Sequence, residues 1–110
     1  IYPIGTNLAA SAAAVTGQIT GGLESLARAE GISFGVVLQA YSLAEYPNAY
    51  WWCGSLATCP YPTVEQMVAM RNSAIAGHTP RLILWYSYFD LLDSDNYALR
   101  WSNLAAAINA

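Results

Sequence analysis

The segments Val36-Val37-Leu38-Gln39-Ala40-Tyr41 and Arg81-Leu82-Ile83-Leu84-Trp85-Tyr86-Ser87-Tyr88 are two continuous runs rich in apolar and β-branched residues. Such runs are typical of strands that are covered on both faces, as the strands of parallel sheets are. We therefore predict strands over residues 34–41 and 81–88.

The residues around these two runs show helical signals. A helix is expected over residues 18–30, with Gly31 at its C-terminal end. Its predicted inner face consists of Ile19, Leu23, Leu26 and Ala27. A second helix is expected over residues 63–77, where Thr63 and Gln66 have the spacing of a capping box. Its predicted inner face consists of Val64, Met67, Val68, Ala74 and Ile75.

A last helix is expected over residues 95–109, after an acidic turn. Its predicted inner face consists of Tyr97, Trp101, Leu104, Ala105 and Ile108. With a strand end at residues 1–5, which closes at Gly5, strands and helices alternate along the chain, and a long loop covers residues 42–62. This alternation predicts an α/β fold built from parallel βα units.

Composition narrows the class of protein. The chain has 110 residues, of which 55% are apolar and 10% charged, and its formal net charge is −3. Four scattered arginines form no basic stripe, so we expect neither nucleic acid nor a membrane as partner. No apolar run approaches the roughly 20 residues of a spanning helix. So small a domain cannot bury all of this apolar surface, which predicts association with another chain or a second copy.

Two further features bear on the origin of the chain. It shows neither an initiator methionine nor a signal-peptide pattern, which we interpret as a processed or truncated fragment. Cys53 and Cys59 are separated by five residues, a spacing that can close a disulfide ring. The alternative is a pair of reduced structural thiols. A disulfide would indicate an oxidising compartment and therefore secretion, and no further Cys or His nearby completes a metal site.

The carboxyl ends of the predicted strands are where a site is expected. Aromatic, amide and hydroxyl side chains with few charges suit a neutral polyhydroxylated ligand, because sugar C–H faces pack on rings. In the loop, the adjacent residues Trp51 and Trp52 cannot easily both be buried, so one of them should be available to a ligand or a partner. The predicted ligand-binding residues are Gln39, Tyr41, Trp51, Trp52, Trp85, Ser87 and Asp90. The alternative is that these aromatic residues fill the core and an interface.

Catalytic groups are sparse. Glycoside hydrolysis needs two carboxyl groups, and Glu45 and Asp90 are the first candidates at this edge. Asp93 and Asp95 fit a helix-capping cluster, and Glu24, Glu30 and Glu65 fit solvated helix faces. His78, at a helix end, fits an interaction with the helix dipole. Phosphate-binding and zinc motifs are missing, so we expect no cofactor, and the catalytic residues stay unassigned.

Four segments considered together carry a family resemblance: Tyr2-Pro3-Ile4-Gly5, Val37-Leu38-Gln39-Ala40-Tyr41, Tyr61-Pro62-Thr63 with Glu65, Met67 and Met70, and Ile83-Leu84-Trp85-Tyr86-Ser87-Tyr88. They resemble the closing βα units of secreted bacterial TIM-barrel proteins of the glycoside-hydrolase type. A complete barrel needs roughly 250 residues, so the resemblance implies a partial (β/α)8 barrel whose strand ends line a sugar cleft. The other strands would come from a missing barrel segment or a second copy. The alternative is a non-enzymatic, self-assembling or partner-binding α/β module.

Overall fold

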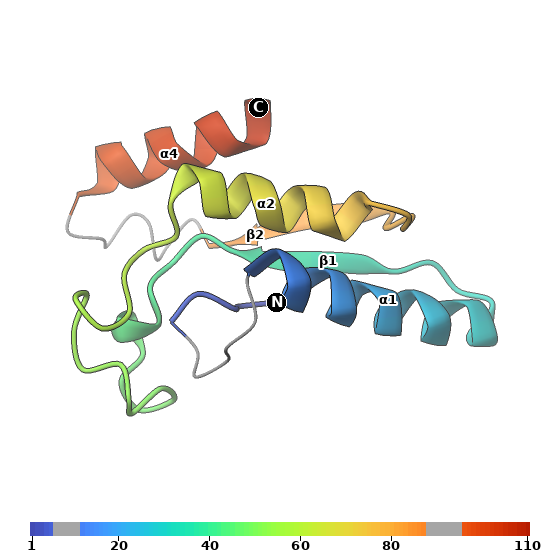
Figure 1. Ribbon diagram of the computed structural model, residues 1–110, viewed down its shortest axis with the longest axis horizontal. Helices are drawn as coiled ribbons and strands as arrows, with labels where there is room; N and C mark the ends of the chain where they lie inside the picture. Colours follow the sequence, from blue (N-terminus) through green and yellow to red (C-terminus); the bar gives the residue numbers. More distant parts are fainter. Residues whose placement is uncertain (6–11, 88–95) are drawn as a thin grey trace.

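The computed structural model describes residues 1–5, 12–87 and 96–110. Helix α1 spans Ala12–Glu30, and strand β1 spans Gly35–Gln39. A short 3-10 helix, η1, spans Leu43–Glu45 and is followed by helix α2, Val64–Ile75. Strand β2 spans Leu82–Tyr86, and helix α4 spans Tyr97–Asn109 (Figure 1). The strands are shorter than the apolar runs that predict them, and α1 begins six residues before the predicted helix.

The two strands form a parallel sheet, as expected for an α/β fold. Leu38 pairs with Trp85, and Gln39 pairs with Tyr86. The amide of Ala40 extends the ladder by donating to the carbonyl of Tyr86 at 3.0 Å. Both strands therefore end at the same edge, and the residues that follow them meet there.

Residues 1–5 lie along the other edge of β1 without forming a regular strand. The nitrogen of Ile1 donates to the carbonyl of Val37. The backbone groups of successive residues point to opposite edges of a strand. Val37 and Ala40 are three residues apart, so the backbone groups of Val37 point away from the edge that Ala40 shares with β2. The N-terminal segment thus occupies the position of a preceding strand.

The described helices form one layer, with α2 between α1 and α4, and α2 packs directly on β1 (Figure 1). The core on this side is formed by Ile4, Val36, Leu38, Ala40, Met67, Met70, Ala74, Leu104 and Ala107. From β2, Ile83 and Trp85 pack against it. On the opposite face Leu82, Leu84 and Tyr86 are 55%, 50% and 41% exposed. One face of this sheet is therefore packed, and the other is open.

The predicted capping box of α2 is confirmed. The Thr63 hydroxyl accepts from the Gln66 amide at 3.1 Å, and the Gln66 side chain accepts from the Thr63 amide at 2.9 Å. On the inner face Met67 and Ala74 are buried, together with Met70, whereas Ile75 is exposed, against expectation. Gly77, just after the helix, has a φ of 73°, a left-handed conformation that favours glycine.

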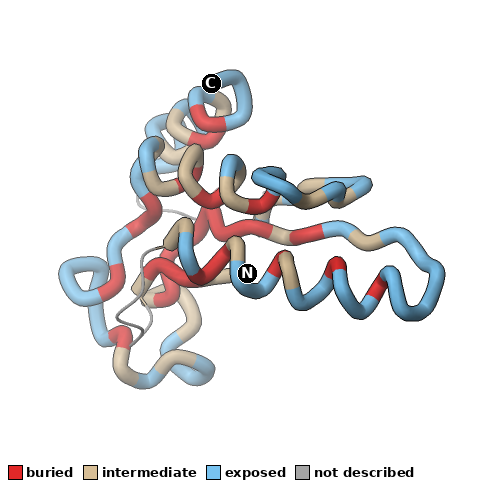
Figure 2. Tube along the Cα trace, turned by 45° about the vertical axis from the view of Figure 1, so that its right-hand side comes forward, coloured by how far each residue is buried: buried red, intermediate tan, exposed pale blue. Residues whose placement is uncertain are grey.

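The predicted inner face of α1 is wrong. Ile19, Leu23 and Leu26 are exposed, and of the predicted set only Ala27 is buried. The helix instead turns small and polar side chains inward, about once per turn (Figure 2). The reason is close packing on α2: a Cβ on Gly17 would lie 2.7 Å from the Ser73 hydroxyl oxygen, which itself donates to the carbonyl of Ala13.

Glu24 is buried on α1, although a solvated position was expected. Its carboxylate accepts from the Thr79 amide at 2.8 Å and from the Arg28 guanidinium at 2.9 Å. The imidazole of His78 lies 3.8 Å away, so His78 faces Glu24 rather than only a helix end. Glu24 therefore ties α1 to the turn that precedes β2.

The inner face of α4 is narrower than predicted. Leu104 is buried together with Ala107, whereas Tyr97, Trp101 and Ile108 are 37%, 46% and 52% exposed. Arg71 of α2 donates to the carbonyl of Ala107 at 2.6 Å and thereby satisfies a C-terminal carbonyl of the helix. Within the described residues, no further helix covers the outer sides of α1 and α4.

The Glu24 contacts predict a pH dependence of stability. The Thr79 N–H, with help from the charges of Arg28 and His78, lowers the pKa of Glu24 below its usual 4.5 despite burial. A lowered folded-state pKa contributes stability above the unfolded-state pKa, and this contribution is lost as pH falls through the folded value. Glu24→Gln should therefore lower the urea midpoint at pH 7 and have a smaller effect at about pH 3.

Glu30→Gln is the matched control, because Glu30 is an exposed glutamate on the same helix. It should leave the midpoint nearly unchanged at both pH values. An equal loss from Glu24→Gln at both pH values would show that ionisation of Glu24 contributes nothing.

Candidate functional site

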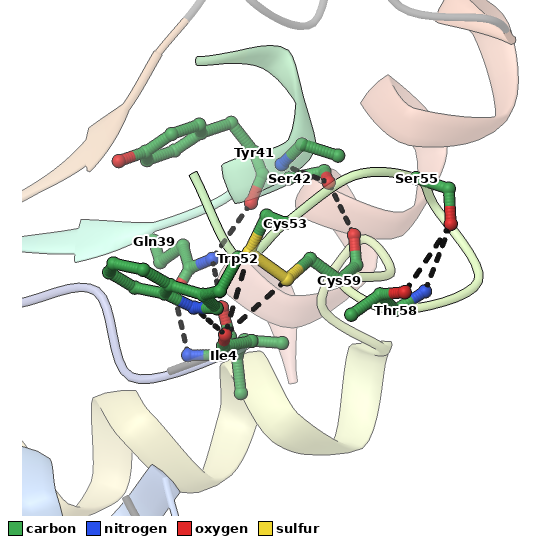
Figure 3. Close-up of a disulfide and its surroundings, with 11 residues drawn as sticks. Ile4, Gln39, Tyr41, Ser42, Trp52, Cys53, Ser55, Thr58 and Cys59 are labelled. Atoms are coloured by element: carbon green, nitrogen blue, oxygen red, sulfur yellow. Dashed lines mark hydrogen bonds between the residues drawn. A yellow bond between two sulfur atoms is a disulfide. The ribbon is translucent and has the colours of Figure 1, made fainter. Parts of the chain in front are cut away.

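Gln39, the last residue of β1, organises the carboxyl end of the sheet (Figure 3). Its side-chain oxygen accepts from the Ile4 amide at 2.8 Å. Its side-chain nitrogen donates to the carbonyls of Ile4 and Tyr41 at 3.0 and 2.9 Å. The side chain is fully buried, so Gln39, one of the predicted ligand-binding residues, presents no surface to a ligand here. A buried amide is stable only when its donors and acceptors are paired, and here the N-terminal segment supplies two of the three partners.

Gly5 connects this segment to the long loop. Its φ of 88° is left-handed, and a Cβ there would lie 3.0 Å from the Cys59 sulfur, so only glycine fits. The Gly5 carbonyl accepts from the indole nitrogen of Trp52 at 3.0 Å. The same oxygen lies 3.6 and 3.4 Å from the sulfurs of Cys53 and Cys59 (Figure 3).

The predicted disulfide between Cys53 and Cys59 is confirmed, with a Cα–Cα distance of 5.5 Å. Both cysteines are buried against Tyr41 and Leu43. The hydroxyl of Ser42 donates to the Cys59 carbonyl and accepts from the Ala44 amide. The disulfide thus lies directly against the backbone that leaves β1, and the loop is fixed at that point.

Beside this framework lies a pocket of about 270 Å³, which we call the tyrosine pocket. It is lined by Tyr2, Tyr41, Tyr46, Ala49, Tyr50 and Tyr86. The Tyr41 ring contacts the rings of Tyr2 and Tyr86 at centroid distances of 5.2 and 5.4 Å, and that of Tyr46 at 5.4 Å. Three separate stretches of chain therefore meet around one buried ring.

The tyrosine pocket is uncharged and mainly apolar, with a few hydroxyl groups. None of its six described lining residues is ionic, and the hydroxyl oxygens of Tyr41 and Tyr50 are 3.4 Å apart. Burial, followed by the contact with Tyr50, raises the pKa of the Tyr41 phenol. This hydroxyl consequently stays protonated and can donate as well as accept. The pocket offers ring faces and hydroxyl groups to a ligand without electrostatic attraction for ions.

A larger hollow, of about 390 Å³, lies at the opposite end of the strands. It is lined by Ser33, Phe34, Gly35, Arg81 and Leu82. It contains no comparable cluster of rings and hydroxyl groups, and sites of parallel α/β sheets form at the carboxyl ends of the strands. The smaller tyrosine pocket is therefore the candidate site.

Trp85, one of the predicted ligand-binding residues, does not line the tyrosine pocket. Trp85 pairs with Leu38, which is buried under the helices, and it packs on the same core. Tyr86 pairs with Gln39 and lines the tyrosine pocket in its place. Residues that are paired across two neighbouring strands lie on the same face of the sheet, so the pairing decides which side chain faces the tyrosine pocket. Trp85→Ala should therefore lower the stability of the fold.

The other predicted ligand-binding residues have different positions. Tyr41 lines the tyrosine pocket. Trp51 is 81% exposed, which confirms that one of the two adjacent tryptophans is available, and Trp52 is half-buried. Ser87 is half-buried just after β2. Asp90 lies outside the described residues, as do Asp93 and Asp95.

Sequence reasoning did not select four of the tyrosines that line the pocket, namely Tyr2, Tyr46, Tyr50 and Tyr86. Tyr46 and Tyr50 belong to the aromatic loop, and the loop's length was the available signal. Tyr2 lies 39 residues before Tyr41, and the bonds of Gln39 to Ile4 help to bring the two together.

Catalytic and metal-binding groups are sparse in the described part of the chain. Glu45, a half-buried residue of η1, is the one first-choice carboxyl candidate that is described. Among residues 1–5, 12–87 and 96–110 no group of three His, Cys, Asp or Glu side chains could hold a metal ion. None of the described helices is long and apolar enough to cross a membrane.

Comparison with known proteins identifies no relative: no family model, curated protein or solved structure matches the chain.

The bonds of Gln39 predict a large cost for its removal. Gln39→Leu would leave the Ile4 amide and two carbonyls without their buried partner, and an unpaired buried polar group costs about 1–3 kcal/mol. We expect the free energy of unfolding, measured by urea titration, to fall by at least that amount. Gln18→Leu, at an exposed glutamine of α1, is the control. Equal midpoints for the two variants would contradict the assigned role.

Proposed function

We propose that this chain is the C-terminal part of a secreted, carbohydrate-active barrel of the glycoside-hydrolase type, and that its tyrosine pocket binds a neutral sugar. The observation that carries the proposal is the pocket itself: rings and hydroxyl groups without a charge, at the carboxyl ends of two parallel strands. Sugars present C–H faces to rings and hydroxyl groups to hydrogen-bonding partners, so both parts of this surface have a use.

The uncovered sheet face supports the partial-barrel proposal. In a barrel, helices cover the outside of the sheet, and the inner face is filled by side chains from strands around the ring. Here the described helices lie on one face, and Leu82 and Leu84 are exposed on the other. A missing barrel segment or a second copy of the chain would cover these side chains. The Cys53–Cys59 disulfide fits an oxidising compartment and hence secretion.

A second candidate is a non-enzymatic module that assembles with itself or with a protein partner. The exposed stripe of Ile19, Leu23 and Leu26 on α1 favours it, because apolar residues at helical spacing on a surface are typical of interfaces. This stripe lies outside the tyrosine pocket, so binding and association can be tested separately.

Sugar binding is tested by calorimetry of the folded chain with a panel of neutral gluco-, xylo-, manno- and galacto-oligosaccharides. At least one member should bind, and Tyr86→Ala should weaken that binding about tenfold, because a ring contact is worth about 1 kcal/mol beyond its area. Tyr97→Ala is the matched control, since Tyr97 is a partly exposed tyrosine on α4. Absence of binding across the panel, or equal affinities for the two variants, would contradict the proposal.

Association is tested by sedimentation at micromolar concentration. We expect species heavier than the 11.9 kDa monomer, because the exposed apolar side chains of the open sheet face favour contacts between copies. Leu84→Lys places a charge on the open face and should shift the distribution toward monomer. Leu56→Lys, at an exposed leucine of the disulfide loop, should not. A compact monomer of the unmodified chain would count against an interface on this face.

A further inference from the structure

Aromatic rings continue beyond the tyrosine pocket into the disulfide loop. The Tyr41 and Tyr50 hydroxyl groups are 3.4 Å apart, and the Tyr50 ring meets the edge of Trp52 at 5.6 Å between centroids. Trp52 in turn contacts Trp51 at 5.9 Å, with the two rings at 90°. We call Tyr50, Trp52 and Trp51 the aromatic track. It leads without interruption from a buried pocket residue to the surface.

Exposure rises along the aromatic track. Tyr41, in the pocket, is 3% exposed, Tyr50 and Trp52 are half-buried, and Trp51 is 81% exposed. A tryptophan used as core filler would be covered within the molecule, and Trp51 is not. Because the edge-to-face contact with Trp52 does not stack one ring on the other, Trp51 keeps a face available for a planar or C–H-rich ligand.

The backbone that carries Trp51 is held on both sides. The Tyr50 amide donates to the Tyr46 carbonyl at 2.9 Å, and the Cys53 amide donates to the Tyr50 carbonyl at 2.9 Å. The Trp52 indole is tied to Gly5, and the disulfide begins at Cys53. The loop is therefore already ordered before a ligand binds. Because of this, little of the free energy gained by a contact with Trp51 is lost to loop ordering.

The charge of this region selects the class of ligand. No Asp, Glu, Lys or Arg occurs between Glu45 and Glu65, so the loop attracts neither acidic nor basic polymers. The tyrosine pocket, at about 270 Å³, is below the usual range of roughly 300–1,000 Å³ for ligand sites, so it holds a short ligand only. A longer ligand must leave the pocket over the loop.

Building on the proposed sugar binding, we infer that the ligand is a neutral oligosaccharide chain that occupies the tyrosine pocket with one end and continues along the aromatic track to Trp51. Its C–H faces pack on the exposed ring, while its hydroxyl groups bond the tyrosine hydroxyl groups in the pocket. Trp51 then adds affinity for long oligosaccharides, which reach it, and none for short ones.

The test is calorimetry with a ladder of one neutral oligosaccharide series, from the monosaccharide to the hexasaccharide. Wild-type affinity should rise with length, and Trp51→Ala should lower the affinity for the longest members about tenfold while leaving that for the shortest unchanged. Tyr86→Ala should weaken all lengths alike. Trp101→Ala, at a partly exposed tryptophan of α4, is the control and should bind every member as wild type does.

The outcomes separate the two proposals. If short and long members bind equally well and depend on Tyr86, the pocket binds sugar and the aromatic track is wrong. If Trp51→Ala lowers the affinity for the shortest member as much as for the longest, Trp51 acts as part of the pocket and its contribution does not depend on ligand length. If no member of any neutral series binds, sugar binding and the track both fail, and the exposed tryptophan is reassigned to a protein interface.

Discussion

The buried carboxamide of Gln39 is the interaction on which the carboxyl end of the sheet depends. It pairs both backbone groups of Ile4 and the carbonyl of Tyr41, so two segments 35 residues apart are held in one arrangement. With Ile4 held in this way, its neighbours Tyr2 and Gly5 lie against Tyr41 and Trp52. A single polar side chain inside an apolar core specifies geometry in this way because every alternative position would leave its hydrogen bonds unmade.

The second constraint is the unequal cover of the sheet. Helices α1, α2 and α4 supply one face with a core, and the other face keeps exposed leucines that a domain of this composition cannot cover by itself. The exposed stripe on α1 has the same origin, since α1 packs on α2 through Gly17 and its large apolar residues point elsewhere. The open sheet face and the α1 stripe thus both follow from the one-sided packing of the described helices.

Local signals in the sequence were sufficient for the order of elements, the capping box at Thr63 and the disulfide. They failed where the outcome depends on a partner far along the chain. The faces of β2 could not be known without the register, because shifting the pairing by one residue exchanges Trp85 and Tyr86. The inner face of α1 was predicted wrongly, because apolar residues at helical spacing do not say which partner covers them. In the described chain Gly17, Thr20 and Glu24 lie on the packed side of this helix instead. The candidate site was found in its general place, through Tyr41 and the aromatic loop, and missed in its lining, which only the fold brings together.

Rigid support and ligand contact are assigned to different groups at this site. The loop is held by backbone hydrogen bonds, by the side chains of Gln39, Ser42 and Trp52, and by the disulfide, and none of these side chains lines the tyrosine pocket. The tyrosine rings are left to shape the pocket, and Trp51 stands outside it on a fixed backbone. Since preorganised contacts lose less free energy to ordering, a weak individual attraction such as a ring against a sugar face can still give useful affinity when several are placed in a row. Neutral carbohydrate is the ligand class for which such a row of weak, uncharged contacts is the suitable means of recognition.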